Sequence, residues 1–489
     1  MRRLFLAASS VAALSTACAT VPAASDSESR LNDFRAQEAW RATPPNPGPL
    51  EELVTPTFQR FTLDNGLTVL VVERHELPLV SMHMAFRAGS AADPDGKEGL
   101  AQITYQLLLE GAGDRDSQAL DNAFADLGTS AGASVSQDGA LVGLQVLTRN
   151  RDQAAALLAD VVLRPRLEAA SFQVRKEQQL SNLAFQVGNP RYLGGEAFAA
   201  AIFGEHHPYG RLGSGTPETV GKLEHKDAKK FYADAAAPKG AALVLAGDIT
   251  VEEARALAEE HFGAWKGGDR PLNAPTAPEV AERAQVIVVP KAGLAQTLIY
   301  MGRPGLQSGH PDEYTLGLAS TVFGGFFGSR LNMNLREDKG YTYGARASVE
   351  PRLGVGPLVA SSSVRADVTG PSLAEFIKEL QGIKSRPITA EELEAAREGM
   401  IRSIPGSFES VSGLAAAAAN LFFKDLPLDR YEKMIEAYES ATAEEVQRAA
   451  ETYFDPALMQ IVLVGDPAVI AEQVPALELG PLQERAPLQ

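Results

Sequence analysis

Hydrophobic residues take every second position in several short segments of the chain, and this pattern predicts strands. Between residues 79 and 86 the alternation is that of a half-buried strand, with one face apolar. The apolar positions there are Val80, Met82, Met84 and Phe86. Asn65-Gly66 separates two further strand-like runs and predicts a tight hairpin turn.

Other segments have the spacing of amphipathic helices. Leu100, Ile103, Leu107 and Leu108 recur at three- and four-residue steps, which predicts a helix that begins after Gly99. A second helical run, from Leu120 to Leu127, stops at Gly128. Thr389 and Glu392 form a candidate capping box before a long helix. The chain therefore mixes short strands with helices.

An internal repeat organises these elements into two copies. Val69-Leu70-Val71-Val72 is echoed by Ile287-Val288-Val289-Pro290, and the run ending in Gly247-Asp248 is echoed by the run ending in Gly465-Asp466. Both pairs are separated by 218 residues. Matches at one spacing predict two copies of one domain. The fold class that we expect is α+β: two homologous α/β domains, each with a mixed, mainly antiparallel sheet flanked by helices.

The first residues have the pattern of a targeting segment. Arg2-Arg3 precede an apolar stretch from Leu4 to Leu14 that is too short to span a bilayer. Cys18 follows, at the place where a bacterial lipoprotein signal puts its lipid-bearing cysteine. We expect an exported, periplasmic lipoprotein anchored by this lipid; ordinary secretory cleavage and a twin-arginine signal are the alternatives.

The segments between these landmarks complete the predicted organisation. A stretch rich in Ala, Pro, Ser and acidic residues follows Cys18 and predicts a flexible tether. The expected parts are a signal segment (1–18), tether (19–55), first domain (56–265), linker (266–280), second domain (281–475) and C-terminal tail (476–489).

Composition narrows the classes of partner. The 489 residues carry a net charge of −17, and no basic stripe is present to neutralise phosphates. We therefore expect no nucleic-acid partner. Cys18 is the single cysteine, so an intrachain disulfide framework is excluded.

Four segments together resemble the pitrilysin/insulinase family of zinc peptidases over about residues 55–475. They are the Gly99-Leu100-Ala101 helix start, the His207-Pro208-Tyr209-Gly210 loop, the paired Gly-Asp strand ends, and the stretch from Leu335 to Tyr343. The resemblance implies two homologous halves that form half of a clamshell chamber for peptides. The family's zinc helix carries the inverted motif His-x-x-Glu-His.

The zinc motif is degenerate in this chain. Gln102 and Gln106 stand where the resemblance places two histidines, Tyr105 stands at the catalytic glutamate, and Asn182 at the third ligand. An amide oxygen is a poor zinc ligand, and a phenol with a pKa of roughly 10 is no general base near neutrality. We expect no metal in this chain. His206-His207 could form a novel metal site, but a structural role of that loop is favoured.

The family's substrate-binding segment is retained. Arg336 and Tyr343 match its Arg and Tyr, which would bind a peptide carbonyl and stabilise an oxyanion, although Tyr341 could replace Tyr343 in that role. Upstream, the stretch with Gly324, Gly325 and Gly328 is similar to the glycine-rich loop that lines the chamber.

These features predict a chain that is inactive alone. By resemblance to the non-metal subunit of heterodimeric members and of mitochondrial processing peptidase, we expect a zinc-bearing partner subunit and peptide substrates, with zinc held by the partner. The alternative is a catalytically inactive peptide-binding or scaffold homologue. A self-sufficient peptidase with an unrecognised site is a third, less favoured reading.

Overall fold

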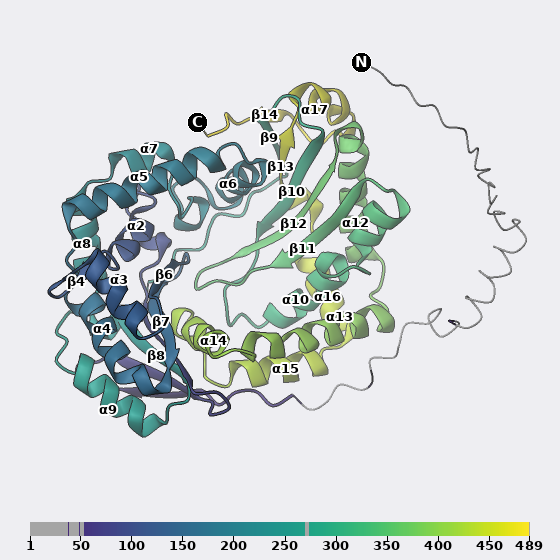
Figure 1. Cartoon of the computed structure of the whole chain (residues 1–489). Helices are drawn as coiled ribbons and strands as arrows, with labels where there is room; N and C mark the ends of the chain where they lie inside the picture. Colours follow the sequence, from purple (N-terminus) through teal and green to yellow (C-terminus); the bar gives the residue numbers. More distant parts are fainter. Residues whose placement is uncertain (1–37, 39–47, 49–52, 269–272, 489) are drawn as a thin grey trace, which may run out of the picture. The chain divides into compact units, whose positions relative to one another are not determined.

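The computed structural model of the chain describes Glu38, Gly48, residues 53–268 and residues 273–488 (Figure 1). The predicted signal segment, Cys18 and most of the tether lie outside the described residues, so the expectations for them stay predictions. Residues Leu53–Gln489 belong to one folded unit, to which the following description refers. Across the described ranges, no helix combines the length and the apolar character needed to cross a membrane.

A six-stranded sheet organises the first half, in the order β1-β2-β8-β3-β7-β6. Its strands are β1 (Gln59–Thr62), β2 (Thr68–Glu73), β3 (Leu79–Phe86), β6 (Gly132–Val135), β7 (Ala140–Leu147) and β8 (Ala241–Gly247). The pair β2/β8 is parallel and the other neighbours are antiparallel. The predicted β1–β2 hairpin is confirmed: Gly66 has a φ of +91°, and the Asn65 side chain accepts a hydrogen bond from the Leu67 amide at 3.1 Å.

The second half repeats this sheet, in the order β11-β12-β10-β13-β9-β14. Its strands are β9 (Gln285–Pro290), β10 (Gln296–Pro304), β11 (Thr342–Val349), β12 (Pro357–Arg365), β13 (Gln460–Gly465) and β14 (Leu482–Glu484). The order β2-β8-β3-β7-β6 corresponds to β9-β13-β10-β12-β11, and the parallel pair β2/β8 corresponds to the parallel pair β9/β13. The predicted α+β fold with two homologous halves is thus confirmed.

Helices flank both sheets. The first half has α2 (Leu100–Leu107), α3 (Ser117–Asp126), α4 (Arg151–Leu163), α5 (Ala169–Gln186), α6 (Pro190–Phe203), α7 (Pro217–Lys222), α8 (His225–Ala235) and α9 (Val251–Phe262), with a small hairpin of β4 (Gly111–Ala112) and β5 (Arg115–Asp116). The second half has α10 (Glu313–Ser320), α11 (Arg330–Asn332), α12 (Thr369–Ser385), α13 (Ala390–Ser403), α14 (Val411–Phe423), α15 (Arg430–Ser440), α16 (Ala443–Tyr453) and α17 (Pro467–Gln473), with π-helical turns η6 (Thr321–Gly325) and η7 (Met333–Asp338).

The predicted capping box at α13 is confirmed, because Thr389 and Glu392 each accept the other's backbone N–H, at 3.2 and 2.9 Å.

The two halves exchange a helix. α6 follows the first half's zinc-motif region in sequence but packs on β10 and β13 of the second sheet, whereas α14 of the second half packs on β3 and β8 of the first sheet (Figure 1). One apolar core therefore joins Leu193 and Phe198 of α6 to Val462 and Val464 of β13. A matching core joins residues of β2 and β8 to residues of α14.

This exchange corrects the expectation that residues 79–86 form a half-buried strand. Val80, Met82 and Met84 of β3 face the first half's core as predicted, but Ser81 and Ala85 on the opposite face are also fully buried. Ala85 packs in the core that α14 completes, so the strand is covered on both sides. A helix from more than 300 residues downstream provides this cover, which local alternation does not reveal.

The segment expected to be a C-terminal tail contributes to the second sheet. β14 pairs in parallel with β9, and the following residue, Arg485, donates its backbone N–H to Val288 at 2.9 Å. The Arg485 guanidinium also forms an ion pair with Glu196 of α6 at 2.6 Å. The chain's end is thereby attached to both halves.

Candidate functional site

The degenerate zinc motif lies on α2, with one residue turned away from the others. Gln102 and Gln106 are half-exposed, one helical turn apart. Tyr105 is fully buried, and its ring lies 5.3 Å from that of Phe86, centre to centre. Asn182 is exposed on α5, a helix that contacts α2. Tyr105 therefore lies in the core, whereas Gln102 and Gln106 reach the surface.

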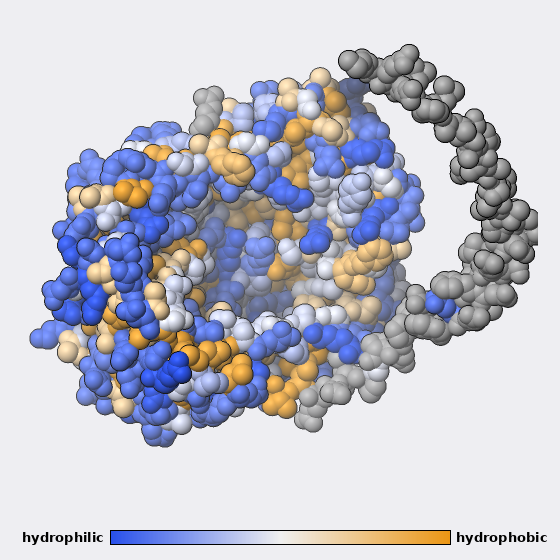
Figure 2. Space-filling view, in the orientation of Figure 1, coloured by the Kyte–Doolittle hydropathy of each residue, from blue (hydrophilic) through white to orange (hydrophobic). Residues whose placement is uncertain are grey.

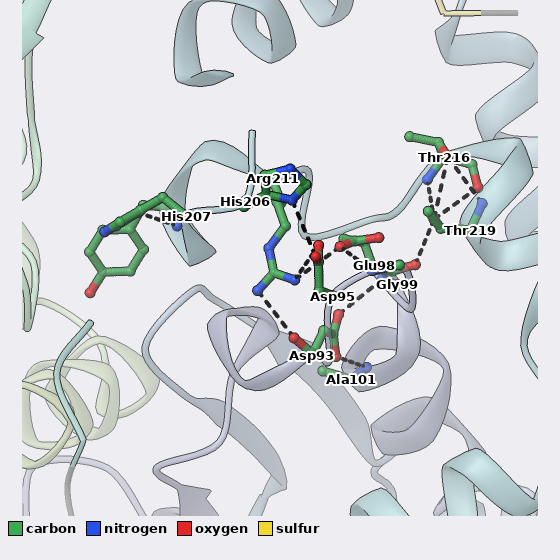
Figure 3. A network of polar contacts seen from close by, with 12 residues as sticks. Asp93, Asp95, Glu98, Gly99, Ala101, His206, His207, Arg211, Thr216 and Thr219 are labelled. Atoms are coloured by element: carbon green, nitrogen blue, oxygen red, sulfur yellow. Dashed lines mark hydrogen bonds and ion pairs between the residues drawn. The ribbon is translucent and has the colours of Figure 1, made fainter. Parts of the chain in front are cut away.

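A buried polar network holds the N-terminus of α2 (Figure 3). Asp93 accepts hydrogen bonds from the backbone N–H groups of Gly99 at 2.9 Å and Ala101 at 2.7 Å. Burial raises the pKa of Asp93 to about 7. Arg211 donates to the Glu98 carboxylate at 3.0 Å and to the Asp93 carbonyl at 3.2 Å. These contacts fix the position of the helix from its N-terminal end.

The donors on α2 and α5 do not fit a zinc ion. The matching positions offer neutral amide groups from Gln102, Gln106 and Asn182, whereas zinc sites in proteins are built from imidazole, thiolate and carboxylate. Within residues 53–268 and 273–488, no group of three or more His, Cys, Asp or Glu side chains is placed to hold a metal ion.

The two adjacent histidines have structural partners. His206 contacts Asp95 at 3.2 Å (Figure 3), and His207 contacts the Thr276 carbonyl at 2.9 Å while accepting the Tyr209 N–H at 3.0 Å. His207 therefore uses both ring nitrogens within its own loop and the linker. This arrangement agrees with the structural role favoured from the sequence.

The retained segment of the second half lies on π-helical and strand elements. Arg336 is on η7, its guanidinium 4.8 Å from the centre of the Phe327 ring and 3.2 Å from the Glu337 carboxylate. Tyr343 is 89% exposed, at a β-bulge where the register between β11 and β12 shifts. Tyr341 is half-buried, so Tyr343 is the tyrosine that solvent or a ligand reaches. π-helical turns are frequent at functional sites.

The glycine-rich stretch brings η6 against the neighbouring strand. A Cβ on Gly324 would lie 2.6 Å from the backbone nitrogen of Ala347, so only glycine permits this approach to β11. Gly325 belongs to the same π-helical turn, and Gly328 lies under the ring of Phe326.

Buried polar side chains that the sequence reasoning missed anchor this segment. Arg330 forms a bidentate pair with Glu392 at 2.6 and 2.7 Å and is 9% exposed. Asn334 donates to both Glu375 and Glu379 of α12 at 2.8 Å. The position of Arg330 directly after the glycine-rich stretch was the one available signal, whereas the contacts of Asn334 depend on a distant helix.

The structure keeps the two sets of predicted residues in separate halves. No hydrogen bond or ion pair between described residues joins Gln102, Gln106 or Asn182 to Arg336 or Tyr343. Figure 2 shows a hollow between the halves of the folded unit, where hydrophilic and hydrophobic residues both reach the surface.

Comparisons with known proteins agree with this architecture. The family model described as Insulinase (Peptidase family M16) matches residues 68–204, and the one described as Peptidase M16 inactive domain matches residues 222–400. An uncharacterised zinc protease of Mycobacterium leprae is 26% identical over 295 residues, 60% of this chain and 65% of that protein, so the match spans just under two thirds of the relative's length.

Two further similarities concern relatives whose names describe inactive proteins. The non-peptidase homolog YmxG of Helicobacter pylori is 22% identical over 383 residues, 77% of this chain and 87% of that protein. The crystal structure of a peptidase M16 inactive domain from Pseudomonas fluorescens superimposes with a TM-score of 0.76 at 27% identity, covering 84% of this chain and 98% of that one. The chain belongs to the M16, or insulinase, peptidase family as a half-length member.

Proposed function

We propose that this chain is the non-zinc subunit of a two-chain M16-type peptidase. It contributes Arg336, Tyr343 and half of a peptide chamber to a zinc-bearing family member. The observation that carries the proposal is an asymmetry. The first half has only amides at the ligand positions, while the second half presents an exposed Arg and Tyr on a segment anchored by Arg330 and Asn334.

The chemistry of each contributed residue is defined by its side chain. Arg336 offers a planar set of donors that suits a peptide carbonyl or carboxylate. The Tyr343 hydroxyl can donate a hydrogen bond to the oxyanion that develops at the scissile carbonyl. The partner's zinc would supply the activated water when bound. Both contributed residues, Arg336 and Tyr343, would therefore act on the substrate and not on the metal.

The test is peptide cleavage by this chain alone, by a zinc-bearing family member alone, and by the two together. If the neighbouring gene encodes a chain with an intact His-x-x-Glu-His motif, that chain is the first partner to test. We expect cleavage only, or far faster, in the mixture. Equal rates for the partner and the mixture would refute the subunit role, and zinc bound stoichiometrically to this chain would refute the metal-free assignment.

Substitutions then assign the residues. In the mixture, Tyr343→Phe should lower kcat/KM by about 100-fold, the loss typical of one oxyanion donor, and Arg336→Ala should lower it as strongly. Arg346→Ala is the matched control, because Arg346 is an exposed arginine on the same strand, three residues beyond Tyr343. If the Arg336 and Tyr343 variants behave like the control, their assigned roles are wrong.

A second candidate is a catalytically inactive peptide-binding or scaffold protein, which the similarity to a protein named non-peptidase homolog favours. In that case, no zinc-bearing partner would increase cleavage, but peptides would still bind to this chain.

We also propose export of the chain to the periplasm with lipid attachment at Cys18. The Arg2-Arg3 start, the short apolar stretch and the single cysteine support it. Metabolic labelling with palmitate should mark the wild-type chain and not Cys18→Ala; labelling of neither would leave ordinary secretory or twin-arginine cleavage as the explanation.

A further inference from the structure

Exposed hydrophobic side chains are concentrated in the segment that carries Arg336. The large hydrophobic residues that stay exposed in the described chain are Val54, Leu77, Val174, Phe185, Val280, Phe327, Met333 and Tyr343. Three of these eight lie between residues 327 and 343, on the segment that carries Arg336. Such a concentration of exposed apolar side chains beside a polar group is typical of a binding surface.

The backbone of Phe327 is held in place by a buried side chain. A buried side chain, Asn332, donates to the Phe327 carbonyl at 2.7 Å and accepts the Ala345 N–H of β11 at 3.1 Å. The Asn332 amide thus connects the glycine-rich stretch to β11, the strand that carries Tyr343. The Arg336 guanidinium lies over the Phe327 ring at 4.8 Å. A backbone segment fixed in this way loses little conformational entropy when a ligand binds.

The surface has the chemistry to receive one residue of an extended peptide. The guanidinium of Arg336 can bind the backbone carbonyl, while the exposed part of the Phe327 ring can contact an apolar side chain. A subunit interface would need roughly 800 Å² from each partner, far more than these few side chains offer. The occupant that fits is a peptide with a bulky apolar residue.

We propose that Phe327 determines specificity by contacting a bulky apolar side chain of the peptide, next to the carbonyl that Arg336 binds, and that Asn332 is its positioning residue. Met333 is also exposed and lies at the start of η7, three residues before Arg336. The inference rests on the proposed function, since it names the peptide class that the retained segment selects.

Peptide binding to the purified full chain tests the inference without the zinc partner. The probes are two fluorescently labelled, flexible peptides that differ at one central position, Phe in one and Ala in the other, with binding measured by fluorescence anisotropy. The wild-type chain should prefer the Phe peptide by about tenfold or more, as expected for one large apolar contact. Phe327→Ala should abolish this preference.

Leu77→Ala is the matched control. Leu77 is 58% exposed, close to the 57% of Phe327, but lies between β2 and β3 of the first half. This variant should keep the preference for the Phe peptide. The inference is overturned if Phe327→Ala keeps the preference as well, or if it weakens both peptides equally.

Asn332→Asp tests the positioning role. An aspartate can still accept the Ala345 N–H, but as a carboxylate it cannot donate to the Phe327 carbonyl. We expect the ratio of the two affinities to fall toward one, with the fold retained by circular dichroism. A general structural defect would weaken both peptides and leave their ratio unchanged, which would refute the role of Asn332.

The outcomes separate this inference from the proposed function. Suppose that the chain prefers the Phe peptide through Phe327, but no zinc-bearing partner cleaves peptides faster in its presence. This result would support the Phe327 contact and refute the subunit role. Faster cleavage by the mixture, without a preference for the Phe peptide, would support the subunit role and refute the Phe327 contact.

Discussion

At the residue scale, the side chain at the position of the family's catalytic glutamate makes α2 a packing element. Tyr105 occupies the position of the family's catalytic glutamate and is fully buried against Phe86, Phe231 and Tyr232. Restoring a glutamate there would bury a carboxylate among aromatic rings, which costs several kcal/mol unless the group is paired. The buried Tyr105 therefore opposes a catalytic glutamate at this position, as the surface amides of Gln102 and Gln106 oppose zinc binding.

Asp93 makes the stability of this region depend on pH. The pKa of its buried carboxyl is about 7, against an ordinary value of 3.8. The folded chain therefore keeps the proton up to about pH 7, while the unfolded chain releases it near pH 4. Since the folded state binds more protons in this window, the free energy of unfolding should fall as pH rises, by at most ~1.4 kcal/mol per unit from this group.

Urea unfolding of Asp93→Asn between pH 4 and 7 measures this contribution. The variant loses one of the two hydrogen bonds to α2, which should cost about 1 kcal/mol, but it should also lose the pH-dependent slope. Asp95→Asn is the control, because Asp95 is an exposed carboxylate in the same network, 64% accessible in its side chain. An unchanged slope in Asp93→Asn would show that Asp93 does not carry the proton.

At the scale of elements, the exchanged helices α6 and α14 couple the two halves. Leu193 of α6 is 2% exposed in the second half's core, and Leu414 of α14 is 1% exposed in the first half's core. Replacing either by alanine should lower the free energy of unfolding by about 2–5 kcal/mol. Because each helix belongs to one half in sequence and to the other in packing, we expect both variants to unfold in a single transition.

Denaturation followed by two probes tests this coupling. In a Trp40→Phe background, which removes the chain's other tryptophan, Trp265 fluorescence reports on the first half, where that side chain is buried. Far-ultraviolet circular dichroism reports on the whole chain. The two curves should coincide for the wild-type chain, Leu193→Ala and Leu414→Ala. Ser412→Ala, an exposed position on α14, should change stability by less than about 0.5 kcal/mol. Separate transitions would show that the halves unfold independently.

Local patterns predicted the elements, but not their partners. The β1–β2 hairpin, strand 79–86, the α2 helix and the α13 capping box follow from turn chemistry and periodicity within a few residues. The helix exchange, the full burial of Ser81 and Ala85, and the inward direction of Tyr105 depend on contacts across long sequence separations. For the site, the motif placed Arg336 and Tyr343, whereas Asn332 and Phe327 became visible only through contacts that folding creates.

At the scale of the whole folded unit, the His-Pro-Tyr-Gly loop connects the halves. The buried Tyr209 hydroxyl donates to Asp138, in the turn between β6 and β7, and accepts the backbone N–H of Gly354 in the second half at 3.0 Å. Asp138 also accepts the Leu353 N–H at 3.0 Å. Burial, with the nearby Asp138 carboxylate, raises the pKa of Tyr209 above its usual range, so the phenol stays a donor. A motif that marks the family in sequence thus acts as an interdomain contact.

Tyr209→Phe should loosen this contact without removing the ring from its packing. The change leaves the Gly354 N–H and one Asp138 oxygen without their partner, so we expect a loss of about 1–3 kcal/mol in the free energy of unfolding. Hydrogen exchange should also speed up at the Gly354 amide, because that group loses its acceptor.

Tyr192→Phe separates this interdomain effect from the loss of a phenol hydrogen bond elsewhere, because Tyr192 is half-buried. Tyr192 donates to the Gly215 carbonyl at 3.2 Å within the first half alone. Its variant should lose some stability but leave exchange at Gly354 unchanged. If both variants leave that amide equally protected, Tyr209 does not hold the halves together. If only Tyr209→Phe exposes it, the loop sets how firmly the two halves are joined.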